Sequence, residues 1–180
     1  MDIIRHNANG KTYIYPAFQA QGFAAQFAFP FAKHLCNGVG LDIGYSKPEW
    51  KLPGAKGVEP SIDPTYHAMN LPRNEFDTFG KWDYIFSSHC LEHVKESWAQ
   101  TLLYWREKLA DNGTLFLYLP GPGQQYWKNW SNKKHVHNLK PEDLREFFEQ
   151  TGWTNIFVSG EDLNNSFYAV AQKFAERENW

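Results

Sequence analysis

The chain has 180 residues, a formal net charge of −2 at neutral pH and two cysteines. This length fits one domain with one core, and the charge balance provides no basic surface for nucleic acid. Two cysteines are too few for a disulfide framework, which favours the reducing cytoplasm. There is no secretory signal pattern and no apolar run near the ~20 residues of a membrane span. We therefore expect a cytoplasmic protein that binds neither nucleic acid nor membrane.

A short apolar run, Val39–Gly44, contains one acid, Asp42, and ends in glycine. Continuous apolar strands are typical of the middle of a parallel sheet, because both faces are covered there. The final glycine lets a ligand approach the backbone closely, since it has no Cβ. In open α/β sheets, ligands bind beyond the carboxyl ends of the strands. This run therefore predicts a central strand that ends at a ligand site.

The segment after this strand, residues 45–54, has two prolines and a final glycine, so it has room for only about one or two helical turns. A phosphate site at the amino end of a long helix is not expected, which argues against a dinucleotide. Residues 55–60 predict the next strand, with Glu59 at its carboxyl end. An acid there commonly accepts hydrogen bonds from ribose hydroxyls, and Asp63 is a second candidate. Residues 66–72 predict a third short strand or an extended run.

Two further strands are predicted on either side of a helix. The aromatic and β-branched run Trp82–Ser88 is typical of a strand, and Thr114–Leu119 is the next one. Between them, residues 92–110 carry large apolar side chains at helical spacing, which predicts a helix over that whole range. Gly113 is expected to end this helix in the left-handed conformation.

The amino-terminal part, residues 1–38, predicts an arm and a helical cap. Thr12–Tyr15 is a candidate short strand, and residues 24–36 predict helical segments interrupted at Pro30, at one edge of the sheet. Near the other end, Pro141 is suited to the first turn of a helix.

Gly152 closes that helix, and residues 153–159 and 166–172 predict an antiparallel pair at the sheet edge. Residues 1–180 are thus expected to form one domain, with residues 39–173 as its core.

Taken in order, these segments resemble a class I S-adenosylmethionine-dependent methyltransferase of the small type that contains a Leu-Glu-His motif. The resemblance implies a Rossmann-like α/β fold, with a mostly parallel sheet and a C-terminal antiparallel hairpin. It also implies methyl transfer from S-adenosylmethionine by in-line displacement, for which the protein mainly supplies orientation. Ser46 and Pro48 occupy places where this family usually has glycine. The segments that carry the resemblance are Gly40–Gly44, Val58–Pro60, Ala68–Pro72, Trp82–Val94 and Asp111–Leu115.

The resemblance also assigns roles to residues of this sequence. Asp42 would shape the cofactor loop, and Glu59 would hold the ribose. The methionine part of the cofactor would lie against Gly44 and Tyr45. The remaining cofactor-binding residues would be Ala68 and Met69 beside the adenine, and Ser88 and His89 beside the reacting methyl.

Three histidines are the predicted catalytic residues. A hydroxyl acceptor benefits from a general base, and imidazole is the side chain best matched to neutral pH. His89 follows a strand end that should face the cofactor. His135 and His137 follow an aromatic loop and would point to the same side of an extended segment. His93, within Leu-Glu-His, is instead expected to pack and to form hydrogen bonds.

No metal site is predicted, although one alternative stays open. His89, Glu92 and His93, with His135 or His137, resemble the Glu-x-x-Glu-His plus His metal set of some RNA 2′-O-methyltransferases. On a helix the first three would share one face. Nitrogen ligands would suit zinc better than Mg²⁺, which prefers oxygen. The histidine in place of the first acid and the lack of a basic face argue against such a site.

The long loop 121–132 suggests the acceptor. Tyr126, Trp127 and Trp130 stand there among glutamines and asparagines, a composition that suits stacking on a sugar or a small aromatic metabolite. The same rings are also suited to packing the loop onto the sheet. We predict methyl transfer to a hydroxyl of a small molecule or glycan. The alternative is a non-catalytic binding module with a degenerate methyltransferase fold, and a homodimer is left open.

Overall fold

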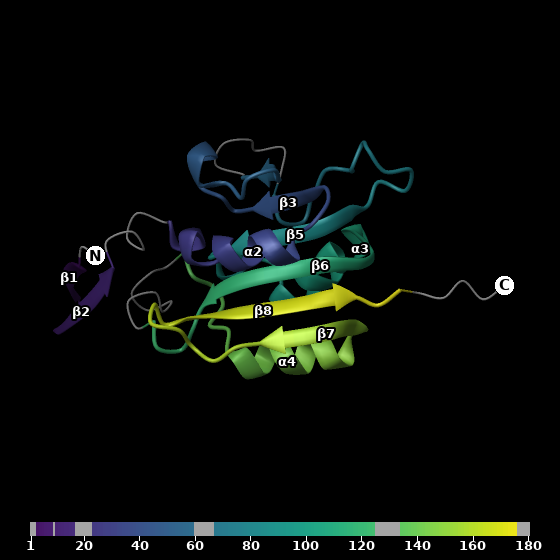
Figure 1. Cartoon of the computed structure of the whole chain (residues 1–180). Helices are drawn as coiled ribbons and strands as arrows, with labels where there is room; N and C mark the ends of the chain where they lie inside the picture. The colour runs from purple at the N-terminus through teal and green to yellow at the C-terminus, as the bar shows by residue number, and fades with distance from the viewer. Residues whose placement is uncertain (1–2, 9, 17–22, 60–66, 125–133, 176–180) are drawn as a thin grey trace.

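The computed structural model describes residues 3–8, 10–16, 23–59, 67–124 and 134–175. Its centre is a six-stranded sheet with the strand order β4-β3-β5-β6-β8-β7 (Figure 1). The first four strands in that order pair in parallel, and β8 and β7 add two antiparallel pairings. This confirms the predicted mostly parallel sheet with a C-terminal antiparallel hairpin. The strands are β3 (Gly40–Ile43), β4 (Lys56–Val58), β5 (Trp82–Ser88), β6 (Leu109–Pro120), β7 (Trp153–Val158) and β8 (Ser166–Lys173).

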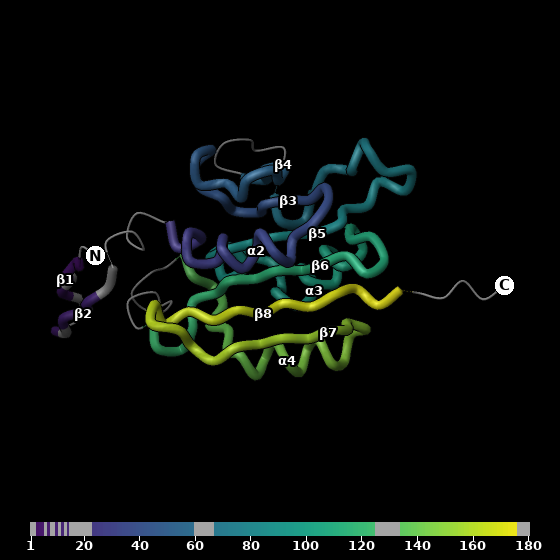
Figure 2. The backbone as a smooth tube through the Cα atoms, in the orientation of Figure 1, coloured from purple at the N-terminus to yellow at the C-terminus, as the bar shows by residue number. Residues whose placement is uncertain are grey.

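Helices cover both faces of this sheet. Helix α2 (Phe29–Leu35) crosses the near face in Figure 1, and α3 (Trp98–Lys108) and α4 (Pro141–Gln150) lie behind the strands. The tube in Figure 2 follows the chain from the first helix to the last strand through this three-layer arrangement. Among the described residues, the short 3-10 helices are η1 (Ala24–Phe27), η2 (Pro48–Trp50) and η3 (Leu91–His93).

The core has two layers because strand side chains alternate between the faces of the sheet. In β6, Leu115 and Leu117 belong to the cluster under α3 and α4, whereas Phe116 and Tyr118 pack toward α2. All four are buried. A strand with apolar side chains on both faces belongs in the sheet interior, which explains why the apolar runs of the sequence predicted the central strands well.

The helix predicted over residues 92–110 begins later than expected. Residues 91–93 form the 3-10 helix η3, and α3 starts only at Trp98. The carbonyl of Glu92 accepts the backbone amides of Val136 and His137, at 2.8 and 3.2 Å, in place of an amide of its own helix. At the other end, Asn112, with φ of 61°, takes the left-handed conformation predicted for Gly113.

Three other predicted elements differ from the structure. Pro30 lies in the first turn of α2, where a proline is tolerated, and α2 covers a face of the sheet instead of an edge. Residues 67–72, the described part of the predicted third strand, form a turn outside the sheet. The candidate strand near Thr12 is β2 (Lys11–Pro16), which pairs with β1 (Ile3–Ala8) in a separate two-stranded sheet.

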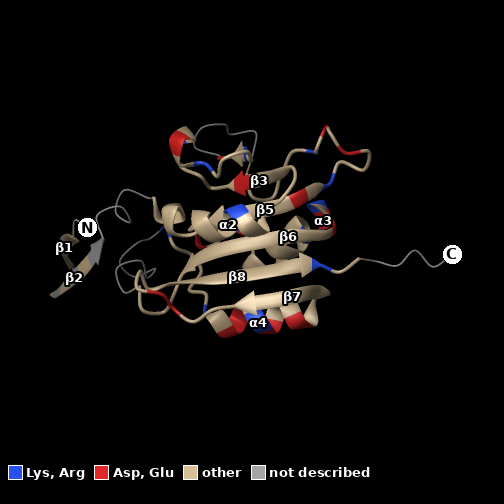
Figure 3. Cartoon of the chain, viewed as in Figure 1, with Lys and Arg blue, Asp and Glu red and all other residues tan. Residues whose placement is uncertain are grey.

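Charged residues lie mainly outside the central sheet. In Figure 3 they gather on α4 and on the connecting segments, while the strands are almost uncharged. None of the helices in the described part of the chain has the length and apolar composition that crossing a membrane requires.

Two neighbouring leucines on α3 test this packing. Leu102 is 0% exposed and lies in the core, whereas Leu103 is 41% exposed. Leu102→Ala should lower the free energy of unfolding by about 2–5 kcal/mol, because it leaves a cavity in a closely packed layer. Leu103→Ala should change it by no more than ~0.5 kcal/mol. Denaturant titration of both variants measures the difference, and equal losses would contradict the assigned orientation of α3.

Candidate active site

The candidate site lies where three parallel strands end together. In the sheet register, Ile43 stands opposite both Val58 and Ser87. The next residues along each strand, Gly44, Glu59 and Ser88, therefore lie at the same edge. Ser87 strengthens the alignment, because its hydroxyl donates a hydrogen bond to the carbonyl of Ile43 at 3.0 Å.

The loop after β3 turns sharply at two residues in the left-handed conformation. Gly44 has φ of 86° and Ser46 has φ of 60°. The amide of Gly44 donates to the carbonyl of Val58 at 2.8 Å, and the amide of Ser46 donates to Glu59 Oε2 at 3.1 Å. Ser46 thus adopts a backbone conformation that favours glycine, at one of the places where the family usually has one. Glu59 fixes this turn from the neighbouring strand.

Asp42 supports the loop from below. Its buried carboxylate accepts the backbone amide of Leu52 at 2.6 Å, which ties the far end of the loop to β3. Burial raises the pKa of Asp42 to about 7, and the hydrogen bond from Leu52 and the charge of Lys51 oppose that increase only partly. Tyr45 also helps to shape the loop, because its ring fills the space that a side chain at Gly57 would occupy. These contacts fit the loop-shaping role expected of Asp42.

The segment with Ala68 and Met69 is anchored to α3. The indole nitrogen of Trp105 donates to the carbonyl of Ala68 at 2.6 Å, and the hydroxyl of Tyr104 accepts the amide of Leu71 at 3.0 Å. These two bonds hold an irregular segment beside the sheet edge, at the place where the predicted third strand is missing.

A cavity of about 940 Å³ opens above these elements. Four predicted cofactor-binding residues line it, from β3, β4, the anchored turn and the end of β5: Gly44, Glu59, Ala68 and His89. Asp42 and Ser88 are buried beneath the edge, and Ser88 Oγ has no hydrogen-bond partner among the described residues. An acid, a left-handed glycine and a small apolar residue on one cavity wall fit the ribose, methionine and adenine parts of S-adenosylmethionine.

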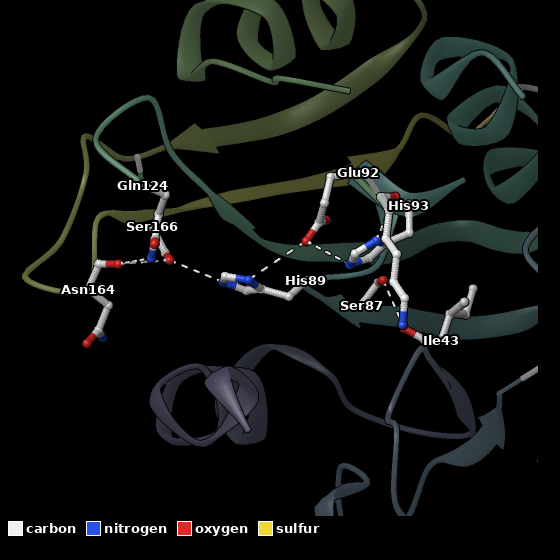
Figure 4. A network of polar contacts seen from close by, with 9 residues as sticks. Ile43, Ser87, His89, Glu92, His93, Gln124, Asn164 and Ser166 are labelled. Atoms are coloured by element: carbon white, nitrogen blue, oxygen red, sulfur yellow. Dashed lines mark hydrogen bonds and ion pairs between the residues drawn. The ribbon is translucent and has the colours of Figure 1, made fainter. Parts of the chain in front are cut away.

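A cluster of histidines surrounds one buried acid beside this cavity (Figure 4). Glu92 Oε1 lies 3.8 Å from His89 Nδ1 and 3.7 Å from His93 Nε2. The His93 ring meets that of His135 edge to face, with 4.4 Å between centroids. The residues come from the end of β5, from η3 and from the segment before α4, so the helical face envisaged for His89, Glu92 and His93 does not exist.

Burial controls the charges in this cluster. It lowers the pKa of His89 to about 3, with further lowering by the nearby charges of His135 and His93. It raises the pKa of Glu92 to about 6, and the charge of His93 opposes this increase. At neutral pH, His89 is therefore a neutral imidazole.

The other predicted catalytic histidines lie farther from the main cavity wall. His135 and His137 both line a small cavity of about 10 Å³, which is room for one water. His137 Nε2 is 2.9 Å from the carbonyl of Glu96. The predicted substrate-binding residues Tyr126, Trp127 and Trp130 lie outside the described residues.

Sequence reasoning missed several residues that line the main cavity. Cys90 lies against Gly44, and His93, Glu96 and Lys134 also line the cavity. For His93 the sequence predicts packing and hydrogen bonding, with metal binding as an open alternative. The one available signal was its place in Leu-Glu-His, directly after a strand that ends at the site. The signal for Lys134 was its place directly before His135, and its carbonyl contacts His93, some forty residues away.

Comparison with known proteins agrees with this geometry. Residues 24–158 match a family model described as a methyltransferase domain, which is most of the chain. The protein therefore belongs to this methyltransferase family. The match confirms the predicted class I S-adenosylmethionine-dependent methyltransferase, and with it the predicted enzyme class and cofactor. No curated protein sequence matches the chain.

Solved structures share the fold at low sequence identity. A S-adenosylmethionine-dependent methyltransferase from Thermotoga maritima, a possible histamine N-methyltransferase, has a TM-score of 0.65 and 18% identity, covering 87% of this chain and 92% of that one. A Haloferax volcanii putative methyltransferase in complex with the Trm112 activator has a TM-score of 0.60 and 12% identity, covering 88% and 96%. Haemonchus contortus phosphoethanolamine N-methyltransferase 2, solved with S-adenosylmethionine, has a TM-score of 0.56 and 13% identity, covering 91% and 54%. The chain thus spans about half of this last protein, and 48% of a CurJ carbon methyltransferase.

A pair of glycine variants tests the cofactor loop. Gly44 and Gly54 both have φ of 86°, but a Cβ at Gly44 would lie 2.5 Å from Cys90 Cβ, whereas a Cβ at Gly54 would meet open space. Both alanine variants should lose roughly 1–2 kcal/mol from the left-handed backbone. Gly44→Ala should lose about 1–3 kcal/mol more from overpacking, and it should bind S-adenosylhomocysteine more weakly. Denaturation and calorimetry measure both effects, and identical behaviour of the two variants would contradict the close contact with Cys90.

The buried acid Asp42 predicts a pH dependence of stability. Its pKa rises from 3.8 to about 7 on folding, so the folded state binds its proton more tightly than the unfolded state does. Its contribution to the free energy of unfolding should therefore fall as the pH rises from about 4 to about 7. Asp42→Asn keeps an oxygen acceptor for Leu52 and removes this titration. Denaturant titrations across that pH range should show that the free energy of unfolding depends less on pH in the variant than in the wild type. Glu49→Gln, at an exposed acid, controls for net charge. An unchanged pH dependence in Asp42→Asn would refute the assignment.

Proposed function

We propose that the protein transfers the methyl group of S-adenosylmethionine to a hydroxyl of a small molecule or glycan within the main cavity. One observation carries the proposal: Gly44, Glu59, Ala68 and His89 line the same cavity at the carboxyl edge of the parallel strands. That edge is where open α/β sheets bind their ligands. In this proposal, these residues bind the cofactor and the acceptor is a hydroxyl compound.

The proposed cofactor roles are those that the family resemblance assigns. Glu59 accepts hydrogen bonds from the ribose hydroxyls. The amide of Ser46 donates a hydrogen bond to Glu59 and holds its carboxylate at the cavity wall. Gly44 and Tyr45 border the methionine part, Ala68 and Met69 flank the adenine, and Ser88 and His89 border the methyl group. Asp42 acts from beneath by fixing the loop. When bound, the cofactor supplies a methyl group on a sulfonium, which leaves as a neutral thioether.

The size of the cavity favours a small acceptor. A volume of about 940 Å³ lies at the upper end of the ~300–1,000 Å³ typical of small-molecule sites. It leaves room for an acceptor beside the cofactor. The wall on that side carries Lys95, Glu96 and Lys134, which suit a polar partner. The predicted stacking of the acceptor on Tyr126, Trp127 and Trp130 remains part of the proposal.

Two imidazole rings support a hydroxyl acceptor over an amine. A neutral amine attacks with its own lone pair, whereas a hydroxyl must lose its proton as the new bond forms. His89 and His93 line the cavity, and His89 is neutral at pH 7 because burial lowers its pKa to about 3. A pKa that low makes His89 a hydrogen-bond acceptor that orients the hydroxyl and a weak proton acceptor. His135 and His137, behind the wall, complete the proposed catalytic set.

The proposal is tested by cofactor binding followed by an acceptor screen. Calorimetric titration should give one S-adenosylhomocysteine site, which Glu59→Gln weakens by ~10–100-fold, because hydrogen bonds to a charged group contribute about 1.5–3 kcal/mol. Glu49→Gln, at an exposed acid of η2, is the matched control. Sugars and small phenols should then yield O-methyl products, and amines of the same carbon skeleton should not. N-methyl products, or cofactor binding without transfer to either class, would overturn the proposed acceptor.

A further inference from the structure

The least expected side chain in the structure is the carboxylate of Glu92. It is 1% exposed, and neither oxygen accepts a hydrogen bond from any described residue. A buried carboxylate loses its hydration, which is costly in a folded protein unless nearby groups compensate it. The groups that surround Glu92 must therefore compensate its charge.

The surrounding nitrogens stand at a distance that fits a shared ion better than a hydrogen bond. Glu92 Oε1 lies 3.7 Å from His93 Nε2 and 3.8 Å from His89 Nδ1. Hydrogen bonds between such atoms are about 2.7–3.2 Å long. Two ligands of a tetrahedral ion with bonds of ~2.1 Å are about 3.4 Å apart. The observed separations are only a few tenths of an ångström longer than that.

Backbone contacts determine which nitrogen of His93 faces the acid. His93 Nδ1 lies 3.0 Å from the carbonyl of Lys134, which can only accept a hydrogen bond, so Nδ1 carries the proton. Nε2 is therefore the ring nitrogen that faces Glu92 Oε1 (Figure 4). A histidine that binds a metal through one ring nitrogen usually donates the hydrogen of its other ring nitrogen to a carbonyl or carboxylate, as His93 does here.

A second imidazole faces the same acid. His89 Nε2 lies 3.1 Å from Ser166 Oγ, which leaves Nδ1 as the ring nitrogen that faces Glu92 Oε1. A cation between these atoms would compensate the buried carboxylate.

His135 supplies a third ligand position. Its ring nitrogen, a Glu92 oxygen and a His93 nitrogen all lie within 4.8 Å of one another. His135 is buried, and the next two residues, Val136 and His137, donate their amides to the carbonyl of Glu92. The backbone therefore holds the two segments of the cluster together without any ion.

We propose that Glu92, His93 and His135 form a binding site for a divalent transition-metal ion of the zinc type. Two imidazoles and one carboxylate make the donor set that suits Zn²⁺ and related ions, whereas Mg²⁺ prefers oxygen ligands. A fourth position is left for a water or a substrate oxygen. This proposal takes up the alternative left open by the sequence, with His135 as the distant histidine and with His89 facing the site without being a ligand.

The site deepens the proposed function, on which its chemical role rests. His93 lines the main cavity, so an ion bound to it has access to the acceptor. A metal-bound hydroxyl loses its proton at a much lower pH than a free one. The acceptor proton leaves to solvent or to a neighbouring base, the oxygen attacks the methyl carbon, and the carbon–sulfur electron pair remains on sulfur. Such an ion would supply the proton removal for which His89 is a weak base.

Metal titration of the full chain tests the proposal. The protein is purified without a polyhistidine tag, stripped with chelator, and titrated with Zn²⁺ and with Mg²⁺ in a calorimeter. We expect one tight Zn²⁺ per chain and no Mg²⁺ binding in the same range. Glu92→Gln and His135→Gln should weaken Zn²⁺ binding by more than ~100-fold, beyond the cost of losing a second-shell partner. His34→Gln, at an exposed histidine of α2, is the matched control and should bind like the wild type.

The outcomes separate the metal site from the proposed function. Absence of stoichiometric Zn²⁺ binding by the wild type, or equal binding by wild type and Glu92→Gln, would overturn the site, whatever the stability of the variants. Titration with S-adenosylhomocysteine on the same samples verifies that they are folded. Zinc binding with no hydroxyl methylation by the loaded enzyme would support the site and reject the acceptor. If the protein binds the cofactor and methylates a hydroxyl but does not bind zinc, the metal site alone is rejected.

Discussion

The register of three parallel strands is the constraint on which the site depends. Ile43 pairs with both Val58 and Ser87, so β3, β4 and β5 end at the same edge of the sheet. A shift of one residue would reverse the faces of a strand and move its terminal residue away from the cavity. The hydrogen bond from Ser87 to Ile43 and the bond from Gly44 to Val58 fix the alignment with polar groups at the strand ends themselves.

Much of the fold could be predicted because its signals are local. The apolar runs of β3, β5 and β6 and the proline that starts α4 each depend on a few consecutive residues. The errors occurred where distant contacts prevail over local preference. Helix α3 begins at Trp98 because the carbonyl of Glu92 bonds to residues near 136, which no spacing within 92–110 reveals. Residues 67–72 read as a strand, yet Trp105 and Tyr104 hold them in a turn.

The candidate site divides in the same way. Gly44 and Glu59 were found because each ends a recognisable strand, and the structure brings both to the cavity. Cys90 and Lys134 were missed although each lies next to a predicted histidine, because neither side chain has a role in the predicted chemistry. The histidines were recognised as chemically important, but their grouping depended on a helix that the structure lacks. Tyr126, Trp127 and Trp130 stay predictions, since they lie outside the described residues.

The bond between His93 and Lys134 joins segments 41 residues apart, with α3 and all of β6 between them. Closing a loop of this length costs entropy that only later contacts repay, so such contacts tend to form late in folding. In the nascent chain, His135 therefore stays apart from Glu92 and His93 until the chain between them has folded. The complete cluster is thus a property of the fully folded chain alone.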